Sequence, residues 1–407
     1  MIQVIRAKKE IWATVALTPS KSISNRVRII QALTKNKISI SNLSTSGDSL
    51  VLADALETDL AEINVQDAGT AYRFLTALFS IKDGVHTLTG SERMKQRPIG
   101  TLVLALQSMG ANIQYLGTTG FPPLKITGSK LKGGRIVVDA SLSSQFISAL
   151  LLIAPSMTGG LHLTFTGEIR SRPYIAMTVS LMKYFGASVM WDESGISVEE
   201  GTYKSGTIQI ENDWSAASFW YLMAALSDRA EIRLQNISFQ SIQGDKIVSE
   251  IFKNFGVISV QVEDDIVLSK HSEFKLPDYF EFNFSQCPDL VIPVGFVCAT
   301  LKIKSLFTGV KNLRIKESDR LIALKNELEK SGAIASIHDD KFSISYFQNP
   351  LEYLSFLSYN DHRMVMAEAA SSIMFRKVDI DDHLPVKKSY PEFWDQLSSA
   401  GFELTIT

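Results

Sequence analysis

The sequence has few cysteines, little net charge and no long apolar run, and each of these features excludes a class of protein. Two cysteines in 407 residues, Cys287 and Cys298, fit neither a disulfide scaffold nor a CxxC metal site, so we expect a reducing, cytoplasmic compartment. The formal net charge of −2 offers no basic excess for nucleic-acid or membrane binding. No apolar run approaches the ~20 residues of a membrane-spanning helix, which argues against a membrane protein.

The length and hydrophobic content predict two domains. A chain of 407 residues is too long for one ordinary core, and a hydrophobic content of 45% is ample to bury two. Any anion that such a near-neutral protein recognises must meet cations that are gathered locally.

A repeat of about 75 residues runs through the chain. A strand-like run, a short polar junction and an apolar helix recur, and each junction carries an aspartate 72 to 76 residues after the last, at Asp67, Asp139, Asp213, Asp289 and Asp361. A second landmark keeps step with the first, because helices end in glycine before a strand at Gly110, Gly186, Gly256, Gly332 and Gly401. With the stretch TPSKSISNR as a first, shorter unit, the repeat predicts six units, three before and three after residues 211–213.

The polar junctions begin helices that are apolar on nearly every side, so these helices should be buried and the glycine-terminated ones should lie outside. Helix N-termini attract anions through their unpaired N–H groups, although each Asp or Ser there can equally serve only as an N-cap. The stretch RIKESDR, Arg314 to Arg320, has the same two interpretations: a solvated helix start laced with salt bridges, or the edge of an active site.

Nine motifs in order resemble the enolpyruvyl transferase family, and specifically its 5-enolpyruvylshikimate-3-phosphate synthase branch. They are SKSISNR, AGTAYR, RPIG, SSQF, SRPY, CPD, RIKESDR, YNDHRM and KKSYP, and they run from about residue 20 to residue 391. The resemblance implies an α/β fold, a two-domain inside-out α/β barrel of six βαβαββ-type repeats with buried helices and outer sheets. It places one domain at 18–212 and the other at 1–17 plus 213–407, with the active site in the cleft between them.

The resemblance also implies a reaction, in which the enolpyruvyl group of phosphoenolpyruvate moves to the 5-hydroxyl of shikimate-3-phosphate and phosphate is released. It implies no metal and no organic cofactor, and we expect a monomer as the default state. The catalytic residues carried over are Asp289, Glu317 and Lys21. Those for shikimate-3-phosphate are Lys21, Ser22, Arg26, Ser143, Ser144, Gln145, Ser171, Tyr174, Asp289, Asn312 and Lys316. Those for phosphoenolpyruvate are Lys21, Gly69, Arg97, Gln145, Arg320, Arg363 and Lys388.

Two alternatives stay open. The sister enzyme, UDP-N-acetylglucosamine enolpyruvyl transferase, shares the fold, but its usual loop cysteine has no counterpart, since Cys287 adjoins the Asp289 junction and Cys298 lies in an apolar helix run. A non-catalytic anion-binding protein of the same fold is the other. The presence of Lys21, Asp289 and Glu317 together speaks against it.

Overall fold

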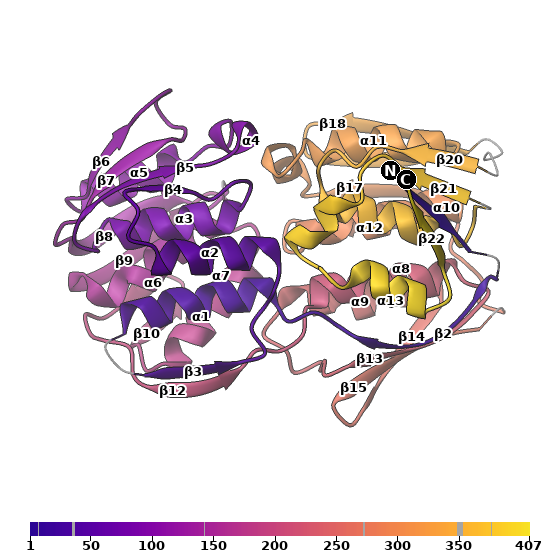
Figure 1. Cartoon of the computed structure of the whole chain (residues 1–407), viewed down its shortest axis with the longest axis horizontal. Coiled ribbons are helices and arrows are strands. Elements are labelled where there is room, and N and C mark those ends of the chain that lie inside the picture. The colour runs from indigo at the N-terminus through magenta and orange to yellow at the C-terminus, as the bar shows by residue number, and fades with distance from the viewer. Residues whose placement is uncertain (7, 35–36, 142, 272, 348–352, 376) are drawn as a thin grey trace. The chain divides into compact units, whose positions relative to one another are not determined.

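The computed structural model describes every residue except 7, 35–36, 142, 272, 348–352 and 376, and it divides into two compact units (Figure 1). The first unit is Pro19–Ile210, and the second unit is Met1–Thr18 together with Glu211–Thr407. Across the described part of the chain, no helix is both long and apolar enough to cross a membrane.

In the first unit, the helices α1, α3 and α6 pack against one another and sheets lie outside them. Its helices are α1 (Lys21–Leu33), α2 (Gly47–Glu57), α3 (Gly69–Phe79), α4 (Glu92–Lys95), α5 (Gly100–Ser108), α6 (Ser144–Ile153) and α7 (Arg172–Tyr184). Its strands are β3 (Ile38–Ser41), β4 (Glu62–Asn64), β5 (Val85–Thr89), β6 (Asn112–Tyr115), β7 (Leu124–Thr127), β8 (Lys132–Asp139), β9 (Thr158–Thr166), β10 (Val189–Asp192), β11 (Gly195–Val198) and β12 (Gly206–Gln209).

The second unit repeats this arrangement around α8, α10 and α12, which also pack against one another. Its helices and 3₁₀ turns are α8 (Trp214–Leu226), η2 (Gly244–Ile247), α9 (Val248–Ile251), η3 (Phe252–Phe255), η4 (Pro288–Leu290), α10 (Val291–Thr300), η5 (Lys311–Ile315), α11 (Arg320–Lys330), α12 (His362–Ser371), η6 (Leu384–Lys388) and α13 (Phe393–Ser399). Its strands are β1 (Ile2–Ile5), β2 (Glu10–Ala16), β13 (Arg229–Gln235), β14 (Val257–Val262), β15 (Asp265–Lys270), β16 (Tyr279–Asn283), β17 (Lys304–Thr308), β18 (Ala333–His338), β19 (Lys341–Phe347), β20 (Tyr353–Phe356), β21 (Lys377–Ile380) and β22 (Glu403–Ile406).

One strand pattern recurs in the four-stranded sheets. Two parallel strands flank a buried helix, as β4 and β5 flank α3, and an antiparallel hairpin extends the sheet, as β7 and β6 do beside β5. The glycines that end the outer helices all have positive φ, between 82° and 98°, which confirms the helix ends predicted from the sequence.

The helices at the centre of each unit are buried because their sequences leave no polar face. Every residue of α8 except Ser215 is buried, every residue of α10 except Thr300 is buried, and α12 is buried throughout. In α12 the buried set includes His362, Arg363 and Glu368, whose polar groups need explanation by function or by partners.

Two features depart from the predicted repeat. The strands before α1 and α8 are exchanged, because β2, which precedes α1 in sequence, pairs with β13 of the second unit, while β12, which precedes α8, pairs with β3 of the first. The first repeat also lacks its hairpin, so β3 and β12 form a two-stranded sheet. The missing hairpin explains why the first junction lies closer to the second than the others do.

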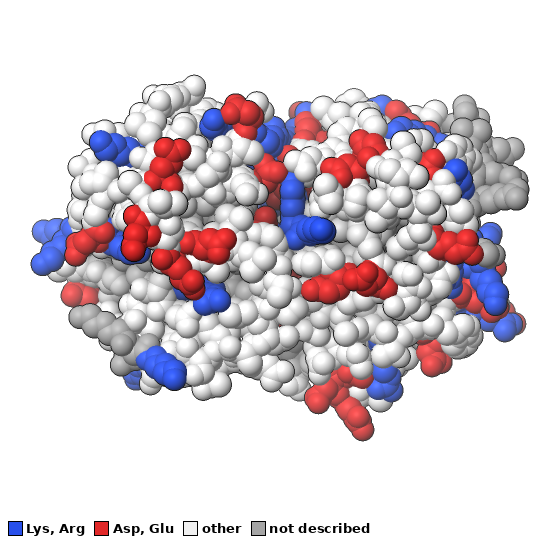
Figure 2. Space-filling model, viewed as in Figure 1, with Lys and Arg blue, Asp and Glu red and all other residues white. Residues whose placement is uncertain are grey.

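The surface agrees with the small net charge. On the face that Figure 2 shows, acidic and basic side chains are scattered over each unit among uncharged residues.

Candidate active site

Arg320, the first residue of α11, is the centre of a charged cluster in the second unit. Its side chain is only 2% exposed; Nη1 lies 2.8 Å from Asp289 Oδ1, and Nη2 lies 2.7 Å from Glu317 Oε2. On its other side, Nε lies 2.7 Å from Oδ2 of Asp361, which is fully buried. One guanidinium therefore pairs with three carboxylates, an arrangement that a solvated helix start does not produce.

Asp289 faces several cations. Its Oδ2 accepts a hydrogen bond from Arg363 Nη2 at 3.0 Å, in addition to the bond from Arg320. Burial opposes the ionisation of this carboxyl, but Arg363, Lys316 and Arg320 outweigh burial and hold the pKa of Asp289 well below its usual range. Asp289 is therefore a carboxylate at neutral pH, ready to accept a proton rather than to donate one.

Two aspartates set the helix starts that carry these cations. Asp319 Oδ1 accepts from Ile322 N at 3.3 Å and caps α11. Asp361 Oδ1 accepts from Arg363 N at 3.0 Å and caps α12 while its other oxygen pairs with Arg320. RIKESDR and NDHRM therefore each supply both a helix cap and residues of the charged cluster. The two interpretations of RIKESDR do not exclude each other.

Lys388, at the end of η6, joins the same region through Asn360. Its Nζ donates to both the main-chain oxygen and Oδ1 of Asn360, each at 2.9 Å. Asn312 lies in η5, and Lys316 follows it as the C-cap residue of that turn. Asn312 and Lys316 therefore lie just before α11, whereas Lys388 comes from η6 and is bonded to Asn360 in the turn before α12.

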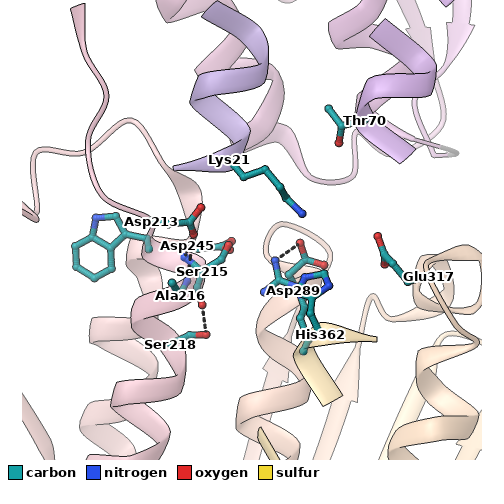
Figure 3. Close-up of polar contacts among 12 residues, drawn as sticks. Lys21, Thr70, Asp213, Ser215, Ala216, Ser218, Asp245, Asp289, Glu317 and His362 are labelled. Carbon is teal, nitrogen blue, oxygen red and sulfur yellow. Dashed lines mark hydrogen bonds and ion pairs between the residues drawn. The ribbon is translucent and has the colours of Figure 1, made fainter. Parts of the chain in front are cut away.

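Sequence reasoning missed a second acid next to Asp289. Asp245, in η2, is buried, and its carboxylate accepts a hydrogen bond from Ser215 Oγ in the first turn of α8 (Figure 3). Burial, and then the negative charge of Asp289, raises the pKa of Asp245 to about 6. Because Asp245 lies in a loop outside the repeated junctions, no spacing in the sequence marked it.

In the first unit, Arg26 ties three helices together. Its side chain is buried on α1; Nε donates to Thr178 Oγ1 at 2.7 Å, and Nη2 donates to Tyr174 O at 3.2 Å and to Ser148 Oγ at 3.3 Å. Nη1 donates to Ser22 O at 2.8 Å. Burial lowers the pKa of Arg26 to about 10. The guanidinium thus has a structural role in joining α1 to α6 and α7, which the motif alone did not indicate.

The starts of α6 and α7 carry the predicted hydroxyl and amide groups. Ser143 caps α6 by accepting from Gln145 N at 3.3 Å, with Ser144 as the first helical residue, and Gln145 Nε2 donates to Thr70 Oγ1 of α3 at 3.1 Å. Ser171 precedes α7 in a left-handed conformation, with φ 53° and ψ 37°. This conformation costs a serine about 1–3 kcal/mol, so the surrounding structure must hold Ser171 in it.

Gly69, the first residue of α3, lies directly against Arg97. A β-carbon on Gly69 would lie 2.5 Å from Arg97 Nη1 and 2.8 Å from Cζ, which is far inside van der Waals contact. Arg97 is buried, and Asp67, which precedes this helix, accepts a hydrogen bond from Ser91 Oγ. Glycine is therefore required at position 69 for Arg97 to occupy its observed place.

Lys21, at the start of α1, pairs with Asp48 at the start of α2. The distance from Nζ to Oδ2 is 2.9 Å, and both side chains are largely buried. Asp48 was not predicted as a partner, although it lies in the junction-like stretch TSGDS.

The structure thus connects the predicted residues in several groups. In the second unit, direct ion pairs join Asp289, Glu317, Arg320 and Arg363. In the first unit, Ser22, Arg26 and Tyr174 are joined by hydrogen bonds, and Gly69 lies against Arg97.

Comparison with known structures defines the class of fold. EPSP synthase from Acinetobacter baumannii superposes with a TM-score of 0.79 at 21% identity, covering all of both chains. The predicted fold class, a two-domain α/β fold with buried helices and outer sheets, is therefore confirmed.

Comparison with sequences identifies the family. The model of the family described as EPSP synthase (3-phosphoshikimate 1-carboxyvinyltransferase) matches residues 54–397. A 3-phosphoshikimate 1-carboxyvinyltransferase from Bacteroides fragilis is 44% identical, covering 100% of this chain and 99% of the relative. One from Methanospirillum hungatei is 35% identical, covering 93% and 94%. The chain belongs to the EPSP synthase family, which confirms the resemblance that the nine motifs indicate.

Proposed function

We propose that this protein transfers the enolpyruvyl group of phosphoenolpyruvate to the 5-hydroxyl of shikimate-3-phosphate and releases phosphate. The observation that carries the proposal is the buried cluster around Arg320, which pairs one cation with the two predicted proton-transfer residues, Asp289 and Glu317. Membership of the EPSP synthase family supports the reaction and its small-molecule substrates, and it favours neither the sister activity nor binding without chemistry.

We assign residues of both units to the two substrates. Shikimate-3-phosphate is held by Lys21, Ser22, Arg26, Ser143, Ser144, Gln145, Ser171, Tyr174, Asp289, Asn312 and Lys316. Phosphoenolpyruvate is held by Lys21, Gly69, Arg97, Gln145, Arg320, Arg363 and Lys388. Guanidinium and ammonium groups suit the carboxylate and phosphate of the second substrate, and hydroxyl and amide groups suit the first.

The chemistry requires one acid and one base. The 5-hydroxyl oxygen attacks C2 of phosphoenolpyruvate while C3 gains a proton, and the tetrahedral intermediate then loses phosphate from C2 and a proton from C3. Glu317 supplies the proton to C3 and Asp289 takes the hydroxyl proton, with Lys21 assisting the transfer. The low pKa of Asp289 keeps the group ionised before substrate arrives, as a base must be, but the same low pKa makes it a weak base.

The arrangement of Arg97 gives a prediction for phosphoenolpyruvate binding. In Gly69→Ala the new methyl group occupies the position of the Arg97 guanidinium, which must move while the fold remains. We expect the KM for phosphoenolpyruvate to rise roughly tenfold or more, the worth of one charge-assisted hydrogen bond, with melting temperature unchanged. Gly117→Ala, where the nearest atom to a β-carbon is 3.6 Å away, is the control. An unchanged KM would separate Arg97 from this substrate.

The monomeric state and the cytoplasmic location belong to the same proposal. The buried thiols of Cys287 and Cys298, which are free and not joined in a disulfide, support the cytoplasmic location. Sedimentation of the purified protein tests the monomeric state.

Phosphate release by the purified protein tests the function. Shikimate-3-phosphate and UDP-N-acetylglucosamine are offered in parallel as acceptors, each with phosphoenolpyruvate. We expect release with shikimate-3-phosphate alone. Release only with the nucleotide sugar would assign the sister activity, and no release with either acceptor would contradict catalysis altogether.

A further inference from the structure

A further buried acid, which is not assigned to either substrate, lies inside the second unit. Glu368, on α12, is completely buried, and neither of its carboxyl oxygens has a hydrogen-bond partner among the residues that the structure describes. An ionised carboxyl in such a place is strongly disfavoured, so the group keeps a proton instead.

Glu327, on α11, is equally buried but has hydrogen-bond partners on both oxygens. Its Oε1 accepts from Tyr359 Oη at 2.8 Å, and its Oε2 accepts from Lys330 Nζ at 2.6 Å and from Leu357 N at 3.1 Å. Burial, and then the charge of Glu327, raises the pKa of Tyr359 to about 12, so the phenol stays a donor. Both oxygens of Glu327 thus have hydrogen-bond donors, whereas those of Glu368 have none among the described residues.

The segment that Glu327 holds leads directly into the proposed active site. Tyr359 and Asn360 both have left-handed backbones, with φ of 50° and 53°, a conformation that non-glycine residues keep only when their surroundings impose it. Asn360 receives the ammonium of Lys388, and Asp361 and Arg363 follow at the start of α12. The buried contact between Glu327 and Tyr359 therefore supports the turn that positions Lys388 and Arg363.

The charges that face Glu368 are mostly negative. Glu327 and Lys330 approach from α11, Asp381 from the loop after β21, and Asp361 from the start of α12. Burial, followed by Glu327 and Asp381, raises the pKa of Glu368 well above its ordinary value, and Lys330 only partly opposes this.

We propose that Glu368 is a positioning residue. Only while Glu368 carries a proton do the Glu327–Tyr359 contact and the turn at 359–360 stay in place. When the proton leaves, a second buried negative charge is added close enough to act on Glu327, and the turn that carries Asn360 loosens. This inference rests on the proposed function, because Lys388 and Arg363 are assigned there to phosphoenolpyruvate.

The sign of the pH effect follows from linkage. Above pH 4.5, the ordinary pKa of a glutamate, the unfolded chain has lost this proton, whereas the folded protein retains it. Where the folded state binds more protons, stability falls as pH rises, until the pH passes the folded-state pKa. Glu368 therefore makes the protein less stable with rising pH through the neutral range, and Gln, which cannot ionise, removes that contribution.

Melting temperatures between pH 5 and pH 9 provide the first test and need no substrate. We expect the melting temperature of the wild type to fall more steeply with pH than that of Glu368→Gln, with Glu329→Gln, an exposed glutamate on α11, matching the wild type. Glu368→Met serves as a second neutral variant if the glutamine protein does not fold. Parallel slopes in the wild type and both neutral variants would overturn the proposal.

Kinetics provide the second test. We expect the KM for phosphoenolpyruvate to rise severalfold once the pH is high enough to ionise Glu368 in the wild type, but not in Glu368→Gln, with the KM for shikimate-3-phosphate behaving alike in both. Tyr359→Phe should raise the KM for phosphoenolpyruvate at every pH. A difference in melting slopes without either KM effect would overturn the positioning role; absent phosphate release in the wild type would instead refute the proposed function.

Discussion

Glu317→Gln is expected to lower turnover by about two to four orders of magnitude, the usual contribution of a general acid, without unfolding the protein. Glutamine has nearly the same shape and can still accept a hydrogen bond from Arg320, whose Nη2 lies 2.7 Å from the carboxylate. It cannot deliver a proton to C3. Steady-state phosphate release measures the loss, and calorimetric binding of shikimate-3-phosphate shows whether the site still forms.

The matched control for that variant is Glu329→Gln on the same helix, which removes the exposed pair of Glu329 with Lys325 and should leave turnover unchanged. If Glu317→Gln turned over at the wild-type rate, Glu317 would have no part in proton transfer, and Asp245, the other acid close to Asp289, would become the candidate.

Arg320→Met is expected to reduce the free energy of unfolding by about 3–5 kcal/mol and to abolish measurable turnover. The substitution keeps much of the buried side-chain volume, but it leaves Asp289, Glu317 and Asp361 without the cation that they share. Removing one member of a buried charge cluster costs far more than breaking an exposed pair, because the remaining charges stay desolvated. Urea unfolding measures this free energy.

Arg314→Met, six residues earlier, provides the comparison. Arg314 is 42% exposed, and its Nη1 lies 3.8 Å from Asp319 Oδ2, so its loss should change the free energy of unfolding by less than about 1 kcal/mol. Equal losses in the two variants would mean that Arg320 is no more than a surface charge.

The sequence predicted the repeated architecture well because the repeat has a physical cause. Helices that are apolar all round must be buried, and glycines with positive φ must end the outer helices, so both features leave a periodic trace in the residues. The exchange of β2 and β12 left no such trace, since either strand satisfies the same local pattern and only the pairing partner differs.

The site residues that the sequence could predict are charged residues at or near the starts of helices. Asp289, Glu317, Arg320 and Arg363 came from motifs, and the second unit brings them into contact. Asp245 could not be predicted, because it lies in the short 3₁₀ turn η2, outside the repeated junctions. Glu327 could not be predicted either, because it belongs to an ordinary charged helix, and tertiary packing decides which side of that helix is buried. The structural role of Arg26 could not be predicted either, because its partners on α6 and α7 lie more than 120 residues away in the sequence.

The exchange of strands between the units has a consequence for how the gene could be cut and rejoined. Because β1 and β2 belong to the second unit, a fragment of residues 211–407 lacks two strands of its own sheets. The chain ends are adjacent, with Met1 N donating to Thr407 O at 3.0 Å. A circular permutant that joins residue 407 to residue 1 and opens between 210 and 211 would make each unit one continuous stretch of chain. Only a single connection, near residue 18, would then link them.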